Sequence, residues 1–322
     1  MKKIALIGEC MIELNGEPFS QMLQTYGGDS LNTAVYLSRI ANQSIQVHYV
    51  TAMGSDPLSV GMINRWENEG VNTELVLTDN NRQPGLYLIQ LDENGERTFL
   101  YWRNQSAARY LLRHPLFDQV EREILQMDMI YLSGISLAIL PQVDREILIE
   151  MLQAASEKGV QIAFDSNYRP TLWDTEEQAR QCYSEVLSVT DLALVTNDDE
   201  RLLWGDNSDE QTLARLHSAG VKRAVLKRGK DACIFRDFDA NQQEIVAPHK
   251  IEHVVDTTSA GDSFNAGFLA AWLAERAAKE CAELGHQMAG TVIQHKGAII
   301  AKEAMAHIQS IKPEIKTKEV SE

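Results

Sequence analysis

Short apolar runs alternate with longer amphipathic stretches along most of this chain. The apolar runs predict buried strands at 3–7, 46–52, 129–133, 160–165, 191–196 and 221–227. The 3.6-residue periodicity between them predicts helices near 29–41, 56–69, 142–158, 175–189 and 209–219. Strands and helices that alternate in this way form a mostly parallel sheet with helices on both faces, so the predicted fold class is α/β. Ligands of such sheets bind beyond the carboxyl ends of the strands.

One segment interrupts the alternation. Two β-rich runs, 84–91 and 96–103, flank the polar turn Asp92-Glu93-Asn94-Gly95 and predict a hairpin. Large apolar residues occupy both faces of this hairpin. We expect it to form a small β-sheet lid together with residues 10–20, with one face over a ligand and the other available for pairing in a homo-oligomer. Since no linker interrupts the pattern, 1–308 is expected to be a single domain and 309–322 a flexible C-terminal tail.

The composition of the chain narrows the range of possible functions and partners. The 322 residues include 30 Lys+Arg and 46 Asp+Glu, which gives a net charge of -16. Such a surface repels nucleic acid and anionic lipid, so neither is an expected partner. The expected partner is a small molecule. No apolar run is long enough to cross a membrane. The four cysteines are far apart in the sequence, which is typical of reduced thiols and a cytoplasmic location.

The strongest chemical signal is the string Asp256-Thr257-Thr258-Ser259-Ala260-Gly261-Asp262, which opens an apolar helical pattern. Small residues before a helix let successive backbone N–H groups point into one cavity, and the helix dipole makes that cavity suitable for a phosphate. Asp262 in the first turn has two interpretations. It can cap the helix, which is the common role of such a residue, or it can accept the proton of an attacking hydroxyl.

The same string resembles the C-terminal DTxxAGD signature of the ribokinase-like, or PfkB-type, sugar kinases. Gly27-Gly28-Asp29-Ser30-Leu31-Asn32 is similar to the N-terminal GG-x-x-x-N signature of that family, about 230 residues earlier. The resemblance extends from Ile4 to about residue 306 and implies a ribokinase-like fold and an ATP-dependent sugar kinase. It also implies that Asp262 is the catalytic base, with an anion hole at Ala260 and Gly261, and that ATP binds with Mg²⁺. Some relatives hold a monovalent cation near Asp256.

Two shorter segments extend the resemblance. Asn197-Asp198-Asp199-Glu200 is similar to an N-x-x-E element, which implies that Asn197 and Glu200 order the magnesium and the phosphates, Glu200 through a water molecule. Lys227-Arg228-Gly229 resembles a nucleotide loop in which Lys227 and Gly229 line the ATP site. An acidic helix start and a solvated basic turn are the structural alternatives for these segments.

Two arginines bear on the substrate. Arg103 follows the hairpin, and Arg169 follows the strand that ends at Asp165. Because guanidinium binds carboxylate in a bidentate manner, the pair predicts a sugar acid rather than a neutral sugar. The hairpin and Asn167-Tyr168-Arg169-Pro170 resemble the subgroup of the family that phosphorylates a 2-keto-3-deoxy sugar acid on its terminal hydroxyl. That resemblance implies sugar contacts from Gly28, Asp29, Asn32, Tyr87, Tyr101, Trp102, Arg103, Arg169 and Asp262. It implies nucleotide contacts from Asn167, Arg169, Asn197, Lys227, Gly229, Ser259, Ala260 and Gly261.

Three other readings stay open at this stage. A kinase for fructose, ribose or a related sugar shares every feature except a use for the two arginines. A non-catalytic sugar or nucleotide sensor needs no Asp262. A dinucleotide-dependent oxidoreductase needs GxGxxG after the first strand, where this chain has Gly8-Glu9-Cys10-Met11-Ile12. In place of the usual early Asp of sugar kinases the chain has Glu13, which leaves the role of that position undecided.

Overall fold

The computed structural model describes residues 1–41, 44–91 and 97–311. The predicted turn at 92–95 and the tail beyond residue 311 lie outside that part of the chain. The described elements are, in order, β1 (Lys2–Ile7), β2 (Met11–Asn15), β3 (Leu23–Gly27), α1 (Asp29–Ala41), β4 (Ile45–Gly54), α2 (Pro57–Asn68), β5 (Val76–Asp79), β6 (Leu86–Leu91), β7 (Arg97–Trp102), η2 (Ala107–Arg113), α3 (Phe117–Ile124), β8 (Met129–Ser133), α4 (Gly134–Ala138), α5 (Gln142–Glu157), β9 (Gln161–Asp165), η3 (Pro170–Leu172), α6 (Glu176–Leu187), β10 (Leu192–Thr196), α7 (Asn197–Trp204), α8 (Asp209–Ser218), β11 (Arg223–Lys227), β12 (Cys233–Asp237), β13 (Gln242–Val246), α9 (Ala260–Leu273), α10 (Ala278–Val292) and η4 (Lys302–Met305).

The main sheet has the strand order β13-β12-β11-β10-β9-β8-β1-β4-β5 within the described residues. Neighbours from β5 through to β11 are parallel, while β12 and β13 add antiparallel strands at one edge. The parallel strands are buried on both faces, which is why they appear in the sequence as continuous apolar runs. The predicted α/β class with helices around a mostly parallel sheet is therefore confirmed.

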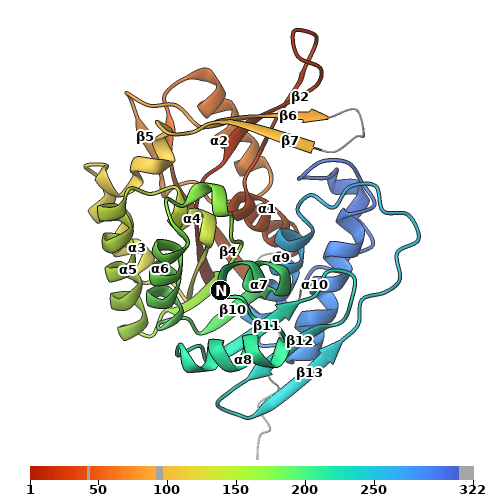
Figure 1. Cartoon of the computed structure of the whole chain (residues 1–322). Helices are drawn as coiled ribbons and strands as arrows, with labels where there is room; N and C mark the ends of the chain where they lie inside the picture. The colour runs from red at the N-terminus through yellow and green to blue at the C-terminus, as the bar shows by residue number, and fades with distance from the viewer. Residues whose placement is uncertain (42–43, 92–96, 312–322) are drawn as a thin grey trace, which may run out of the picture.

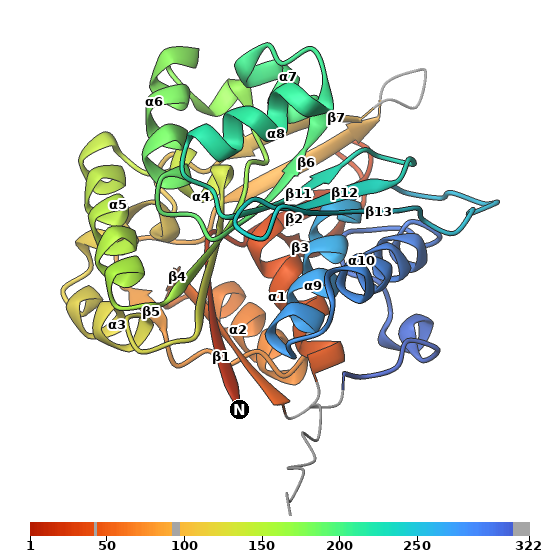
Figure 2. The same ribbon diagram turned by 90° about the horizontal axis from the view of Figure 1, so that it is seen from below.

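Each face of the main sheet has its own apolar core. On one face, Ile7, Leu132 and Phe164 pack against α3, α5 and α6. On the other, Ile4, Leu6 and related side chains pack against α1, α9 and α10, and Figure 2 shows these two groups of helices on opposite sides of the sheet. Alternate residues of a strand point to opposite faces, so a single apolar run supplies both cores. No helix of the described chain combines the length and the apolar character needed to cross a bilayer.

A second, smaller sheet with strand order β3-β2-β6-β7 lies across one end of the molecule (Figure 1). We call it the lid. β6 and β7 are antiparallel, as predicted for the hairpin, and β2 pairs with β6 in parallel. The sequence analysis placed the partner segment at 10–20. The structure adds β3, whose residues Leu23, Gln24 and Thr25 are exposed and give no buried-strand pattern.

Connectivity fixes where the lid lies. β1 ends at Ile7 and the chain enters β2 only four residues later, so the lid is attached at the carboxyl ends of the parallel strands. The same edge of the sheet holds the ends of β8, β9, β10 and β11 at Ser133, Asp165, Thr196 and Lys227. Side chains from distant parts of the sequence therefore meet under the lid.

Candidate active site

Helix α9 begins at the string that the sequence analysis singled out. Ser259 precedes it with a φ of 65°, the left-handed region, and makes no side-chain cap to the helix backbone. The N–H of Ala260 donates to the carbonyl of Thr257 at 3.2 Å, whereas the N–H groups of Gly261 and Asp262 have no acceptor in the described structure. These two groups, at the positive end of a 14-residue helix, are suited to an anion.

Asp262 does not cap its own helix through its side chain. Its Oδ2 accepts hydrogen bonds from Asn32 Nδ2 and Ser259 Oγ, both at 2.8 Å. Burial and the neighbouring charge of Asp29 raise the pKa of Asp262 to about 7. A carboxyl group with a pKa close to neutral is suited to proton transfer, so the arrangement favours the second of the two roles open to this residue.

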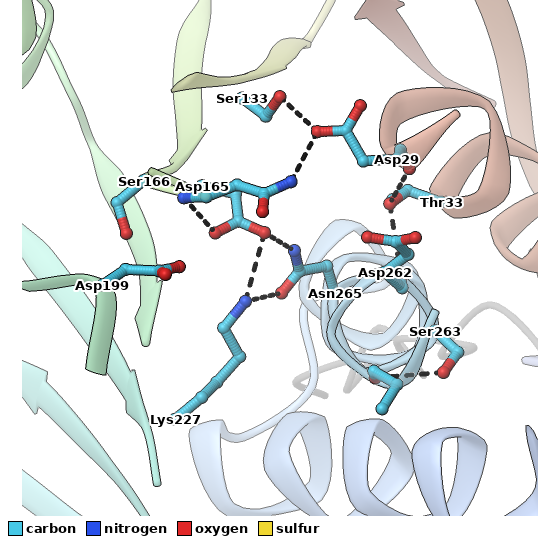
Figure 3. A network of polar contacts seen from close by, with 12 residues as sticks. Asp29, Thr33, Ser133, Asp165, Ser166, Asp199, Lys227, Asp262, Ser263 and Asn265 are labelled. Carbon is cyan, nitrogen blue, oxygen red and sulfur yellow. Dashed lines mark hydrogen bonds and ion pairs between the residues drawn. The ribbon is translucent and has the colours of Figure 1, made fainter. Parts of the chain in front are cut away.

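Asp29 lies at the start of α1 and faces three parts of the chain. Its Oδ2 accepts from Ser133 Oγ at 2.5 Å and from Asn167 Nδ2 at 2.7 Å, and its backbone oxygen accepts from Thr33 Oγ1 at 3.0 Å. Thr33 Oγ1 also lies 3.3 Å from the backbone oxygen of Asp262. Asp29, Asn167 and Asp262 were all predicted site residues, and this network brings them together. Figure 3 shows Asp29, Thr33 and Asp262 within it.

A second network lies below α9. Lys227 at the end of β11 is buried, and its Nζ lies 3.2 Å from Asp165 Oδ2 and 3.0 Å from Asn265 Oδ1. Asn265 Nδ2 in turn donates to Asp165 Oδ2 at 2.6 Å. A Cβ built on Gly261 would lie 3.8 Å from Lys227 Nζ, so the ammonium group stands directly behind the anion-binding turn.

Asp199 in the first turn of α7 points toward Asp165 and Lys227 (Figure 3). Burial raises the pKa of Asp199 to about 6, even though the charge of Arg169 opposes that shift. Arg169 is half exposed and its Nη1 lies 3.5 Å from Asp199 Oδ1. Two carboxylates, Asp165 and Asp199, thus lie beside two cations, Lys227 and Arg169.

Glu200, predicted as the metal-associated residue, has a protein partner. The residue is buried, and its Oε2 lies 2.5 Å from Arg215 Nη2, which also contacts Asp206 at 2.7 Å. Burial raises the pKa of Glu200 while Arg215 lowers it. Asp199, which the N-x-x-E pattern leaves unmarked, is the acidic residue of α7 that points to the network.

The inner face of the lid carries aromatic residues. Tyr87 and Tyr101 lie directly opposite each other on β6 and β7, with ring centroids 6.0 Å apart. The Tyr87 hydroxyl donates to Glu13 Oε2, and burial raises the pKa of Tyr87, so this hydroxyl stays protonated. Trp102 follows Tyr101 in the strand and therefore lies on the opposite face, with 59% of the residue exposed. Trp102, predicted to line the sugar pocket together with the two tyrosines, thus faces away from them.

Arg103 reaches from the end of the lid to the core of the molecule. Its Nη2 pairs with Glu9 Oε2, and its Nε is buried without a hydrogen-bond partner in the described part of the chain. Its Cζ lies 5.8 Å from the centroid of the Tyr101 ring. Arg103, Tyr101 and Trp102 also line an open cavity of about 1140 Å³ beside residues 80–84. Both arginines predicted to bind a carboxylate thus have carboxylate partners of their own, Glu9 and Asp199.

Two further predicted residues, Gly229 and Asn197, lie at the edge of the site. Gly229 has a φ of 59° and would place a Cβ in open space, while Asn197 begins α7 and is partly buried. Both are exposed enough to meet a ligand, and neither joins the two networks. Asp256 binds the N–H groups of Thr258 and Gly297 through its two oxygens. The described residues of the site that were not predicted include Glu9, Thr33, Ser133, Asp165, Asp199 and Asn265. Ser133 and Asp165 stand at the carboxyl ends of strands, and a polar residue at such a position is a feature of the sequence that could have pointed to them.

The donor set fits a nucleotide phosphate with a divalent cation. The free N–H groups of Gly261 and Asp262 suit phosphate oxygens, and Asp165 and Asp199 suit a hard cation or its water ligands. Among the described residues, no group of three or more His, Cys, Asp or Glu side chains converges closely enough to hold a metal alone. A Mg²⁺ ion would therefore take most of its ligands from phosphate and water, which is its common behaviour in proteins.

The fold and this site together define a carbohydrate kinase. The model of the "pfkB family carbohydrate kinase" matches residues 1–305, and the chain belongs to that family. A Haemophilus influenzae protein named 2-dehydro-3-deoxygluconokinase is 57% identical over 311 residues, which span 96% of this chain and 99% of that protein.

Solved structures agree on the fold. The structure of 2-dehydro-3-deoxygluconokinase from Thermotoga maritima superposes with a TM-score of 0.81 at 20% identity, covering 93% of this chain and 94% of that one. An E. coli structure described as a putative ribokinase II in complex with ATP and Mg²⁺ superposes with a TM-score of 0.79 at 21% identity, covering 92% and 94% of the two chains. The expected ribokinase-like fold is confirmed.

Proposed function

We propose that this kinase transfers the γ-phosphoryl group of ATP to the terminal hydroxyl of 2-dehydro-3-deoxy-D-gluconate and forms the 6-phosphate. The name of the H. influenzae relative, at 57% identity over nearly the full length of both chains, supports the substrate. The observation that carries the reaction is Asp262, whose pKa of about 7 and whose place beside two free N–H groups suit a base at a phosphoryl-transfer site.

The proposed step is an in-line displacement at the γ-phosphorus. The terminal hydroxyl of the sugar attacks, the bond from the γ-phosphorus to the bridging oxygen of ADP breaks, and the hydroxyl proton goes to Asp262. The N–H groups of Gly261 and Asp262 stabilise the oxygens of the transferring group. Asn32 and Ser259 hold the Asp262 carboxylate in place through their hydrogen bonds at 2.8 Å. Mg²⁺, when bound with ATP, neutralises phosphate charge.

The nucleotide is proposed to lie on the α9 side of the site. Lys227 supports the phosphate turn from behind, and Gly229 leaves space in the adjoining loop. Asn167 and Arg169 border the phosphates, while Asn197 and the carboxylates of Asp165 and Asp199 order the metal and its water. Glu200 supports this arrangement from beneath α7 through Arg215.

The sugar is proposed to lie between the Gly27–Gly28 turn and the lid. Asn32 has a buried Oδ1 with no partner in the described residues, and Asp29 and the Gly28 backbone lie beside it. Tyr87 and Tyr101 cover the sugar from the lid, and Arg103 with Arg169 takes the carboxylate. The second candidate is a kinase of a neutral sugar, which is favoured by the carboxylate partners that both arginines already have.

Replacement of Arg103 tests the carboxylate assignment. We expect Arg103→Ala to lower kcat/KM for the sugar acid by about 100-fold, because a charge-assisted hydrogen-bonded pair is lost, and to change kcat/KM for a neutral sugar by less than about threefold. Steady-state kinetics with both sugars measure the ratio. Arg122→Ala, in the exposed part of α3, is the matched control. Equal losses of kcat/KM for the two sugars would show that Arg103 does not bind the carboxylate.

The pH dependence of the reaction follows from Asp262. Since its pKa is raised to about 7, the free enzyme holds the base protonated below neutral pH, and we expect kcat/KM to rise with pH and level off above about 7. The effect of Asp262 on the stability of the fold has the opposite pH dependence. Its contribution to the free energy of unfolding is present below the ordinary pKa of an Asp and is lost as pH rises through about 7. A pH profile that is flat between 5 and 8, about the range over which such a group titrates, would contradict the assignment.

We also propose that copies of the chain pair through the lid. Leu100 and Trp102, on the face of the lid opposite Tyr87 and Tyr101, are 41% and 59% exposed, which is unusual for large apolar residues on one small sheet. A pairing of this kind would leave the inner face of the lid over the sugar.

A further inference from the structure

Two buried carboxylates, Glu9 and Glu13, lie where the chain enters the lid, and they differ in their hydrogen bonds. Glu13 in β2 uses both of its oxygens within the lid: Oε1 accepts from Thr25 Oγ1 at 3.1 Å, and Oε2 accepts from the Tyr87 hydroxyl. Both partners are cross-strand neighbours of Glu13 in the sheet. The hydrogen bonds of Glu13 therefore hold the lid together, although Glu13 occupies the place of the usual early acidic residue.

Glu9 uses only one of its oxygens. The residue is 3% exposed, its Oε2 pairs with Arg103, and its Oε1 has no hydrogen-bond partner in the part of the chain that the structure describes. An unpaired oxygen of a buried carboxylate is costly, so such an atom calls for an explanation. Arg103 Nε next to it is also buried and unpaired. The pair thus leaves one buried acceptor and one buried donor without a partner among the described residues.

The surroundings of Glu9 place it on the sugar side of the site. A Cβ on Gly28 would approach the backbone oxygen of Glu9 to 2.1 Å, so Glu9 lies against the turn that leads into Asp29 and Asn32. A Cβ on Gly85 would come within 2.9 Å of Glu9 Oε1, so the absence of a side chain there leaves the oxygen uncovered. Asn32 Oδ1, in the first turn of α1, is another buried acceptor without a partner among the described residues.

We propose that Glu9 is a sugar-binding residue whose Oε1 accepts a hydrogen bond from a hydroxyl of the substrate, while its Oε2 orients Arg103 for the substrate carboxylate. This inference rests on the proposed sugar-acid kinase and adds a specificity determinant to it. A site built around a buried polar atom strongly rejects analogues that lack the matching hydroxyl, because the atom is then left unpaired. The substrate class that fits is a sugar acid that offers both a carboxylate and a free hydroxyl.

The test compares Glu9→Gln with Glu13→Gln by calorimetric titration of the sugar acid and, separately, of MgADP. Glu9→Gln keeps the size of the side chain, and we expect it to raise the Kd of the sugar acid by about tenfold or more with the Kd of MgADP unchanged within about twofold. Glu13→Gln is expected to raise the sugar Kd by less than about threefold and to lower the unfolding temperature, because its bonds lie within the lid. A sugar Kd for Glu9→Gln within about twofold of wild type would overturn the proposal.

A double-mutant cycle with Arg103→Gln separates a direct contact from an effect through the arginine. If Glu9 touches the sugar, Glu9→Gln weakens binding in the Arg103→Gln background as well, whereas an effect that disappears there would refute the contact. Should the wild-type protein bind a neutral sugar better than the acid, the proposed substrate fails. The same variants titrated with the preferred sugar then decide the role of Glu9 independently.

Discussion

Asp262→Asn is expected to lower kcat by about three orders of magnitude or more and to leave the KM of both substrates within about threefold. The asparagine keeps an oxygen for the hydrogen bonds from Asn32 and Ser259, so the start of α9 should hold its shape. It cannot take up the proton of the attacking hydroxyl. An interaction that is needed only in the transition state affects kcat and not KM. Initial rates of ADP formation measure both constants.

Asp198→Asn is the matched control for that variant. Asp198 lies in the acidic first turn of α7, its side chain is 85% exposed, and its charge is equally negative. We expect its kcat to stay within about twofold of wild type. An Asp262→Asn variant whose kcat lies within about tenfold of wild type would remove Asp262 from the role of base.

Lys227→Met is expected to lower the free energy of unfolding by about 3 kcal/mol. Methionine has nearly the same length, but the variant leaves the buried carboxylate of Asp165, which is 4% exposed, without its cation. Removing one partner of a buried ion pair costs more than an exposed pair is worth. Because the Lys227 ammonium lies behind Gly261, the affinity for MgATP should fall as well. Urea unfolding and nucleotide titration measure the two effects.

Lys230→Met in the same turn is the control for charge alone. Lys230 is exposed, and its replacement should change the free energy of unfolding by no more than about 0.5 kcal/mol. If Lys227→Met were no less stable than Lys230→Met, the network of Lys227, Asp165 and Asn265 would not be a stabilising element of the site.

Much of the fold could be predicted from local patterns. The central parallel strands are buried on both faces, so each appears as a continuous apolar run, and helices with one apolar face lie between them. Two of the strands that were missed lack that signal. β3 exposes Leu23 to Thr25, and β13 exposes four of its five residues, because both lie at the edge of a sheet. Edge strands are held by backbone pairing that side-chain pattern does not reveal.

The candidate site was predictable where the chemistry is local. The small residues before α9 and the acidic first turn stand together in the sequence, so Gly261 and Asp262 could be identified directly. Partners that come from distant segments could not. Arg103 pairs with Glu9 across 94 positions, and Glu200 pairs with Arg215 across 15, so the charges that look free in the sequence are neutralised in the fold. Nothing in the sequence states which oxygen of Glu9 is left without a partner.

The most direct test of the central claim is the release of ADP by the purified protein with MgATP. We would compare 2-dehydro-3-deoxygluconate with fructose, ribose and gluconate at equal concentration. The account predicts a kcat/KM for the keto-deoxy acid that exceeds those for fructose and ribose by about 100-fold or more, since both neutral sugars lack the carboxylate that Arg103 and Arg169 are proposed to bind. A preference for fructose or ribose, or no release of ADP with any of these sugars, would contradict it.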